Sequence, residues 1–211
     1  MIVAVVPAGG KSTRMGRPKL LLPLAGRPVL AHLIHALQAG GADRVLVVAA
    51  PHLPELVPLA QSAGADAFVL PHDTPDMRAT VEAGLAWVEH AWAPAAGDAW
   101  LLAPADHPTL EPAAVRRLIA ARTQHPERSI FLPTHAGRRG HPVLLGWHHV
   151  SAIRALPAGQ SLNQYIRTQS AATLEVPVAS PAVLLDLDTP EDYERLLRQL
   201  EGPSAPPPAG G

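Results

Sequence analysis

The first nineteen residues constrain the fold of this chain more than any other segment. Residues 2–6 (IVAVV) are apolar and mostly β-branched, which is typical of a strand buried in a parallel sheet. The turn that follows is built of small residues and carries four cations within nine residues: Lys11, Arg14, Arg17 and Lys19. Small residues let a backbone approach a ligand closely, and backbone N–H groups with nearby cations suit a polyphosphate. The segment therefore predicts a nucleotide-binding loop.

The loop has two simpler interpretations. A Gly-Gly pair after a strand is often only a tight connection, but four cations in nine residues disfavour that interpretation. Gly10-Lys11-Ser12 also looks like the end of a Walker A motif, which needs a glycine five positions before its last one. That position is Val5, inside the expected strand, so the spacing excludes this motif. The dinucleotide pattern G-x-G-x-x-G is absent as well.

Composition limits the class of protein. With 211 residues, 47% hydrophobic and 17% charged, the chain has the size and composition of one globular domain. The net charge of −1 gives no basic field for nucleic acid. The absence of cysteine excludes disulfides, thiolate catalysis and cysteine-bound zinc. The first strand is too short for a membrane span and has no basic leader, so we expect a cytoplasmic protein with neither a membrane nor a nucleic acid as partner.

Strand-like and helix-like segments alternate along the chain, which predicts a single-domain α/β fold with a mostly parallel central sheet. Strands are expected at 2–6, 44–49, 66–70, 99–103, 129–132 and 183–190, and residues 137–145 read as a loop running into an edge strand. Helices are expected at 28–37, 53–62, 77–91, 112–122, near 150, at 162–168 and at 190–200. The domain then spans 1–201, and the Pro/Gly/Ala-rich residues 202–211 are expected to be disordered.

Acidic residues follow two of the expected strands: Asp106 after 99–103, and Asp186 with Asp188 near the end of the chain. Ligands of such sheets lie at the carboxyl ends of the strands, where these acids would meet the cationic loop. Carboxylates beside a polyphosphate are ligands that Mg²⁺ prefers. Simpler roles stay open, because Asp106 suits a helix N-cap or turn and the sequence 188–191 (DTPE) is a helix-start signal. Asp186 either joins this site or points to the opposite face.

Several motifs in order along the chain resemble the MobA/MocA-like nucleotidyltransferases. They are Ala8-Gly9-Gly10, Arg14-Met15-Gly16, Lys19, the run 21–28 (LLPLAGRP), Asp106 before a proline, Arg139-Gly140-His141-Pro142, and the segment 186–192 (DLDTPED). The resemblance implies a Rossmann-like three-layer fold. It also implies transfer of a nucleoside monophosphate from an NTP to a small phosphorylated acceptor, with release of pyrophosphate.

The resemblance also implies roles for individual residues. Arg14, Lys19 and Asp106 would be catalytic, and Asp106 and Asp188 would hold Mg²⁺, with Asp186 as a further candidate ligand. The nucleotide would be bound by Pro7, Ala8, Gly9, Gly10, Lys11, Ser12, Arg14, Lys19, Asp73, Thr80 and Asp106. The acceptor region would contain His107, Arg139 and His141. An ionised acceptor phosphate needs no general base, so the histidines are expected to be loop or wall residues.

The motifs leave two subfamilies open, which differ in the nucleobase of the NTP that they use. The two residues between Gly16 and Lys19 resemble the molybdopterin cytidylyltransferase type, which favours CTP, whereas Gly9-Gly10 resembles the guanylyltransferase type. Molybdopterin is the acceptor implied by the family, although Asp76-Met77 and residues 159–163 (GQSLN) depart from its usual pattern. A molybdoenzyme or its chaperone is a candidate protein partner, and the sequence does not fix the oligomeric state. A sugar phosphate or phosphoalcohol as acceptor, and an inactive nucleotide-binding accessory protein, are the alternative functions.

Overall fold

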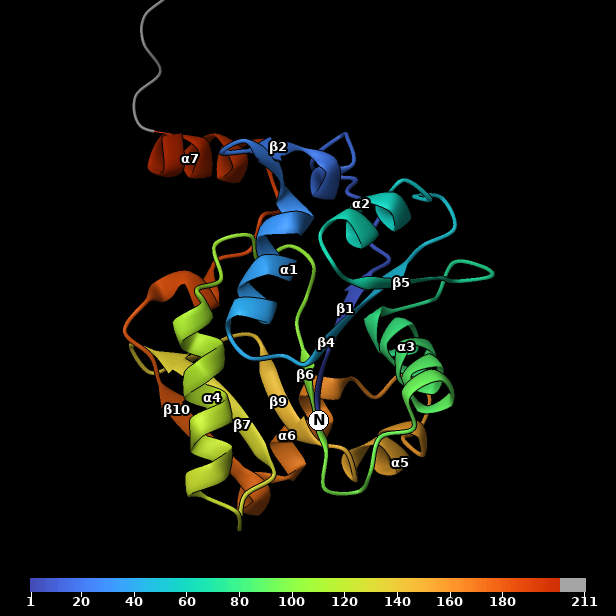
Figure 1. Ribbon diagram of the computed structural model, residues 1–211, viewed down its shortest axis with the longest axis vertical. Coiled ribbons are helices and arrows are strands. Elements are labelled where there is room, and N and C mark those ends of the chain that lie inside the picture. Colours follow the sequence, from blue (N-terminus) through green and yellow to red (C-terminus); the bar gives the residue numbers. More distant parts are fainter. Residues whose placement is uncertain (202–211) are drawn as a thin grey trace, which may run out of the picture.

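The apolar run at the N-terminus forms the middle of a mixed sheet in the computed structural model, which describes residues 1–201 (Figure 1). The sheet has the order β10-β7-β9-β6-β1-β4-β5, and the short β8 pairs with β7. Its strands are β1 (Ile2–Ala8), β4 (Arg44–Ala49), β5 (Asp66–Val69), β6 (Ala99–Leu102), β7 (Ile130–His135), β8 (Arg138–Arg139), β9 (Val143–Gly146) and β10 (Thr173–Pro177). The pairs β1–β4, β4–β5, β1–β6 and β7–β10 are parallel, whereas β9 runs antiparallel to both neighbours.

The order of the strands places a topological switch beside β1. The chain builds outward from β1 through β4 to β5 and then returns to pair β6 with the other edge of β1. In open α/β sheets, ligands lie in the crevice at the carboxyl ends of the strands where the strand order reverses. The loops after β1 and β6 are therefore the ones that the fold offers to a ligand.

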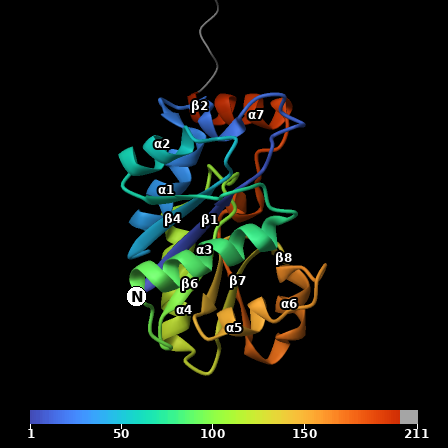
Figure 2. The ribbon, with the colours of Figure 1, turned by 90° about the vertical axis from the view of Figure 1, so that its right-hand side faces the viewer.

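Helices cover both faces of the sheet because the strands alternate apolar side chains to both sides. Ala4 and Val6 face one core with α1, α2 and α4, whereas Val3 and Val5 face a second core with α3, α5 and α6 (Figures 1 and 2). The helices are α1 (Val29–Ala39), α2 (Leu56–Ser62), α3 (Met77–Trp92), α4 (Pro112–Gln124), α5 (His149–Arg154), α6 (Leu162–Thr168) and α7 (Pro190–Glu201), with 3-10 turns η1 (Lys19–Leu21), η2 (Ser170–Ala172) and η3 (Pro181–Leu184). This arrangement confirms the predicted three-layer α/β fold.

A small hairpin anchors the C-terminal helix next to the cationic loop. Strands β2 (Pro23–Leu24) and β3 (Arg27–Pro28) pair in an antiparallel ribbon, and α7 lies beside it (Figure 2). The Tyr193 hydroxyl of α7 donates to the Pro23 carbonyl. The segment after residue 184 is thereby brought back to the start of the chain, 170 residues away in sequence. Within residues 1–201, no helix is long and apolar enough to cross a membrane.

Three predictions about strands are wrong. Residues 183–190 form no strand, because their backbone bonds go to loops: the Val183 carbonyl accepts from His141 N, and Leu187 N donates to the Asp106 carbonyl. The edge strand expected after 137 is β9, which lies inside the sheet between β6 and β7. The edge strand on that side of the sheet is β10, which was not predicted. Residues 202–211, the predicted disordered tail, lie outside the described part of the chain.

Candidate active site

A cleft of about 310 Å³ opens at the switch between β1 and β6. Its lining comes from the loop after β1, the loop after β6 and the start of α3. The lining residues are Pro7, Ala8, Gly9, Gly10, Lys11, Lys19, Leu20, Thr74, Pro75, Asp76, Met77, Thr80, Pro104, Ala105 and Asp106. Eight of the eleven residues predicted to bind nucleotide are among them. The other three, Ser12, Arg14 and Asp73, do not line the cleft, and their positions are described below.

The loop 9–19 is folded into a turn and anchored at its centre. Ser12 and Gly16 have φ angles of 50° and 69°, and Met15 N donates to the Ser12 carbonyl at 3.0 Å. The Met15 side chain is buried in the core, and the Ser12 hydroxyl accepts from Lys19 N at 3.4 Å. The loop thus presents its cations on a fixed frame. At its start, a methyl group on Gly9 would lie 3.2 Å from the Thr80 hydroxyl.

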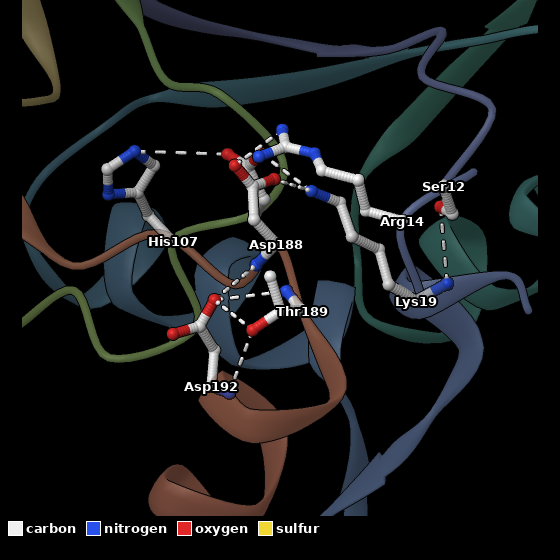
Figure 3. Close-up of polar contacts among 8 residues, drawn as sticks. Ser12, Arg14, Lys19, His107, Asp188, Thr189 and Asp192 are labelled. Carbon is white, nitrogen blue, oxygen red and sulfur yellow. Dashed lines mark hydrogen bonds and ion pairs between the residues drawn. The ribbon is translucent and has the colours of Figure 1, made fainter. Parts of the chain in front are cut away.

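Lys19 joins two acids that are far apart in the sequence (Figure 3). Its Nζ donates to Asp106 Oδ2 and to Asp188 Oδ1, both at 2.9 Å. Arg14 reaches the second oxygen of Asp188 from the same loop, at 2.7 Å. One cationic group therefore lies between two carboxylates. Lys19, Asp106 and Asp188 are together called the inner cluster below. Asp186 is exposed and is not part of it.

The inner cluster is largely shielded from water. The side chains of Lys19, Asp106 and Asp188 are 12%, 25% and 24% exposed. Burial disfavours the charged ammonium, but Asp106 and Asp188 outweigh this effect and raise the pKa of Lys19 above 10.5. Burial likewise disfavours the Asp188 carboxylate, yet the hydrogen bond from Lys19 and the charges of Lys19 and Arg14 lower its pKa below 3.8. Lys19 and Asp188 are therefore charged at neutral pH.

Neither acid caps a helix, although Asp106 lies in a turn, as one of its simpler roles allowed. At the start of α7, the Asp192 carboxylate accepts from Thr189 N at 3.0 Å, and the Thr189 hydroxyl accepts from Asp192 N at 3.2 Å. These two residues form the capping pair and leave the Asp188 carboxylate free to face Lys19. The N-cap of α4 is Glu111, so Asp106 is not needed there either.

Backbone contacts hold the two acidic loops in place. Leu187 N donates to the Asp106 carbonyl at 2.8 Å, which ties the loop of one acid to the loop of the other. The turn η3 before Asp188 packs directly on Gly140, where an added Cβ would lie 2.2 Å from the Val183 carbonyl oxygen. Only glycine allows this approach. Gly140 in the predicted acceptor motif therefore helps to position a predicted metal ligand.

The other end of the loop forms a second ion cluster, called the outer cluster below. Lys11 Nζ lies 3.1 Å from Asp73 Oδ2, and His52 Nδ1 lies 3.0 Å from Asp73 Oδ1. The hydrogen bonds from His52 and Lys11 lower the pKa of Asp73 below 3.8. Asp73 thus holds the loop from outside the cleft. Ser12 lines a separate hollow of about 320 Å³ next to His52.

The predicted acceptor residues divide between a ring pair and a second cavity. The His107 and His141 rings are 5.4 Å apart, and burial lowers the pKa of His107, while burial and His107 lower the pKa of His141 to about 4. Both rings are therefore neutral at pH 7. His141 also lines a cavity of about 190 Å³, together with Leu132, Arg139, Gly140, Val143, Asn163, Ile166 and Arg167. The ring pair links this cavity to the cleft, because His107 follows Asp106.

Several residues that line the cleft or the second cavity were not predicted from the sequence. Thr74, Pro75, Asp76 and Met77 form the wall of the cleft before and at the start of α3. The departure at Asp76-Met77 from the family pattern was the available signal. Asp76 caps α3 by accepting from Ala79 N at 2.8 Å, and Met77 is 52% exposed at the cleft. No motif pointed to Arg167, because its place in the lining of the second cavity depends on the position of α6.

Comparison with known proteins agrees with this geometry. Residues 4–174 match the family model described as "MobA-like NTP transferase domain". A probable molybdenum cofactor guanylyltransferase from Nostoc sp. strain PCC 7120 is 29% identical over 90% of this chain and 88% of its own length. A 2-C-methyl-D-erythritol 4-phosphate cytidylyltransferase from Ralstonia nicotianae is 38% identical over 56% of this chain, and the match spans 49% of that relative.

Solved structures share the fold over nearly the whole chain. The crystal structure of an Rv0371c homologue from Mycobacterium sp. strain JC1 has a TM-score of 0.77 and 25% identity, and the match covers 95% of this chain and 96% of that one. The resemblance inferred from the sequence motifs is thereby confirmed at the level of family and fold.

Proposed function

The chain belongs to the family of the MobA-like NTP transferase domain, and we propose that it is a Mg²⁺-dependent nucleotidyltransferase. It transfers the nucleoside monophosphate of an NTP, with CTP favoured, to a phosphorylated acceptor and releases pyrophosphate. The proposed acceptor is the molybdopterin cofactor. The observation that carries the proposal is the meeting of Asp106 and Asp188 around one ammonium group, beside a cleft lined by the small-residue loop.

The donor set fits Mg²⁺. Oxygens of Asp106 and Asp188 both reach the same Lys19 nitrogen, so they converge on a point that already holds a positive charge. Within residues 1–201, no group of three or more His, Cys, Asp or Glu side chains is placed to hold a metal. Mg²⁺ is usually held by one or two carboxylates, with phosphate oxygens and water as the other ligands. Asp106 and Asp188 are thus the proposed protein ligands of a metal that the nucleotide completes.

The residues of the chain would act by position and charge. Backbone N–H groups of the loop and the cations Lys11 and Lys19 hold the triphosphate, and Arg14 approaches it from the side of Asp188. An ionised oxygen of the acceptor phosphate forms a bond to the α-phosphorus, while the α–β bridging bond breaks and pyrophosphate leaves. Lys19 moves from the carboxylates to the phosphates and stabilises their developing charge. Mg²⁺, when bound, neutralises phosphate charge in the same way.

The second cavity is the proposed place of the acceptor phosphate. Arg139 and Arg167 bring positive charge to its lining, and Asn163 adds an amide. Arg139 is bound to Glu175 at 2.7 Å, whereas Arg167 forms no ion pair within residues 1–201. Arg167 is therefore the cation most available to a phosphate. The neutral His107 and His141 rings form the wall toward the cleft.

The test is a pyrophosphate-release assay with Mg²⁺ and each of the four NTPs. Molybdopterin, 2-C-methyl-D-erythritol 4-phosphate and a hexose 1-phosphate serve as acceptors, and mass spectrometry identifies the product. We expect release with CTP and molybdopterin. Release only with a sugar phosphate or phosphoalcohol would support the second acceptor class. Nucleotide binding without release for any acceptor would support the accessory-protein function, and no binding of any NTP would overturn the nucleotide site.

Use of GTP is the second candidate, and Gly9 favours it. Glycine leaves more room beside Thr80 than alanine would, and a guanine is larger than a cytosine. The relative from Nostoc that matches 90% of this chain is also named as a guanylyltransferase. If the base lies there, Gly9→Ala should weaken GTP binding more than CTP binding. Gly10→Ala is the matched control, because a Cβ at Gly10 meets nothing within 4 Å. Equal effects of the two variants would place the base elsewhere.

A further inference from the structure

Arg78 makes four side-chain hydrogen bonds outside the inner cluster. It is the second residue of α3, and its guanidinium donates Nε to Glu82 Oε1 at 2.6 Å. Nη1 donates to the carbonyls of Pro157 at 2.7 Å and Gln160 at 3.0 Å, and Nη2 donates to the Leu156 carbonyl at 2.8 Å. The side chain is 13% exposed. A planar guanidinium can satisfy several acceptors at once, which a lysine ammonium on a flexible stem does less well.

These bonds connect the walls of the two cavities. On one side, neighbours of Arg78 line the cleft, namely the N-cap residue Asp76 and, in α3, Met77 and Thr80. On the other side, residues 156–160 lead directly into α6, which carries Asn163 and Arg167 of the second cavity. A capping box between Ser161 and Gln164 fixes the start of α6 to this loop. A shift of the loop is therefore passed on to α6.

Apolar packing alone does not set the position of this loop. Leu162, Tyr165 and Ile166 bury one face of α6 in the core, but Pro157, Ala158 and Gly159 are exposed. Three of the loop's carbonyls are satisfied by Arg78. Loss of the guanidinium leaves the Leu156 and Gln160 carbonyls to water and Pro157 with only its bond from Gln160 N, which loosens the loop, while the buried face of α6 keeps the helix folded.

We propose that Arg78 is a positioning residue that sets α6, and with it the second cavity, relative to the nucleotide cleft. The inference rests on the proposed function, in which these two cavities hold the acceptor phosphate and the NTP. It predicts that Arg78 affects the use of the acceptor and leaves nucleotide binding unchanged. Arg154 offers a matched control, because it also bonds to α3, through Glu89 at 2.7 Å, but neither Arg154 nor Glu89 adjoins in sequence a residue that lines either cavity.

Hydrogen exchange of the full-length protein tests the positioning without any substrate. In Arg78→Met, we expect amides of 156–167 to exchange about tenfold faster, while those of β1 and β4 keep their rates. Arg78→Lys should fall between Arg78→Met and the unchanged protein, and Arg154→Met should leave residues 156–167 unchanged. Unchanged exchange in Arg78→Met, or equal acceleration across the whole core, would overturn the inference.

Kinetics with CTP and molybdopterin provide the second measurement. We expect Arg78→Met to raise KM for the acceptor about tenfold, with kcat within about twofold and the Kd for CTP unchanged. Partial rescue by Arg78→Lys is expected as well. A fall in kcat alone, or an equal effect of Arg154→Met, would contradict the positioning role. If the unchanged protein transfers no nucleotide, the proposed function fails, and the exchange measurement still decides the role of Arg78.

Discussion

The two ends of the cationic loop are held by ion clusters of the same chemistry but of different burial. In the outer cluster, Lys11 and Asp73 are 65% and 44% exposed, whereas Lys19 of the inner cluster is 12% exposed. Exposed pairs contribute about 0–1 kcal/mol because water and salt screen them. Removing one partner of a shielded cluster leaves an uncompensated charge and costs more. The comparison teaches that burial and the second carboxylate, more than the presence of a cation, distinguish the proposed catalytic end of the loop.

The largest effect is expected from neutralising the acids of the inner cluster. Asp106→Asn and Asp188→Asn should each lower the rate of Mg²⁺-dependent transfer by about 10²–10³-fold, because each removes a proposed metal ligand. Steady-state pyrophosphate release measures the effect, and circular dichroism checks the fold. Asp186→Asn is the control for the exposed neighbour and should change the rate less than about threefold. Equal losses in all three variants would place Asp186 in the metal site as well.

Gly140→Ala is expected to displace Asp188 of the inner cluster without changing any charge. In Gly140→Ala, the new Cβ would clash with the Val183 carbonyl, so η3 and the segment leading to Asp188 must shift. We expect the free energy of unfolding to fall by about 1–3 kcal/mol and the transfer rate to fall with it. Urea denaturation measures the first effect. Gly97→Ala, where a Cβ meets nothing within 4 Å, should be neutral. Normal stability of Gly140→Ala would mean that η3 is not held by this contact.

Replacing the cation of the inner cluster should expose the repulsion between its acids. Lys19→Met should destabilise the protein by about 1–2 kcal/mol at neutral pH. The pKa of Asp188 is lower in the folded state than in the unfolded chain. Its contribution to the free energy of unfolding is therefore present above about pH 4 and is lost as the pH falls through the lowered pKa of the folded state. The destabilisation should therefore shrink below pH 4. Urea denaturation at pH 7 and pH 3 checks the sign, and an effect that grows in acid would contradict it.

Magnesium ions provide a second check on Lys19→Met. In the proposed metal site the ion would have to displace the ammonium of the unchanged protein, whereas the variant would offer it two carboxylates without that partner. We therefore expect 10-fold higher Mg²⁺ affinity, about 1.4 kcal/mol, and a larger rise in Tm for Lys19→Met than for the unchanged protein. Lys11→Met is the control from the outer cluster and should respond to Mg²⁺ like the unchanged protein.

The smallest effect is expected at the outer cluster. Asp73→Asn should change stability by less than about 1 kcal/mol and the Kd for NTP by less than about fivefold, because the cluster is exposed and Asp73 itself does not line the cleft. Raising the salt concentration should reduce even this difference. Calorimetric titration at 50 mM and 500 mM salt measures it. A loss as large as that of Asp106→Asn would mean that burial does not separate the two clusters.

Much of the fold could be predicted because the relevant signals are local. The apolar runs of β1, β4 and β6 and the helical stripes of α1 and α3 identified these elements. The family motifs pointed to Lys19, Asp106 and Asp188, which the structure brings together. The predictions failed where tertiary contacts decide. Residues 183–190 have a strand-like pattern, but β10 already occupies the edge and loops take their hydrogen bonds. In β10, Pro177 and the exposed Glu175 weakened the strand signal.

The position of β9 could have been found from the sequence, because residues 143–145 (VLL) are all apolar, as a strand buried on both faces requires. The contacts of Arg78 could not. Apart from Glu82, its acceptors are backbone carbonyls 78 to 82 residues away, which no side-chain pattern predicts. The sequence predicted that Asp106 and Asp188 meet the cationic loop, but not that Lys19 donates directly to both acids, which lie 87 and 169 residues away along the chain.

The most direct test of the central claim is a calorimetric titration of the protein with CTP and with GTP, with and without Mg²⁺. If Asp106 and Asp188 hold the metal of a metal–nucleotide complex, at least one of the two nucleotides should bind in the presence of Mg²⁺ and bind at least tenfold more weakly without it, about 1.4 kcal/mol. Absence of binding in both conditions, or equal binding with and without Mg²⁺, would contradict the account.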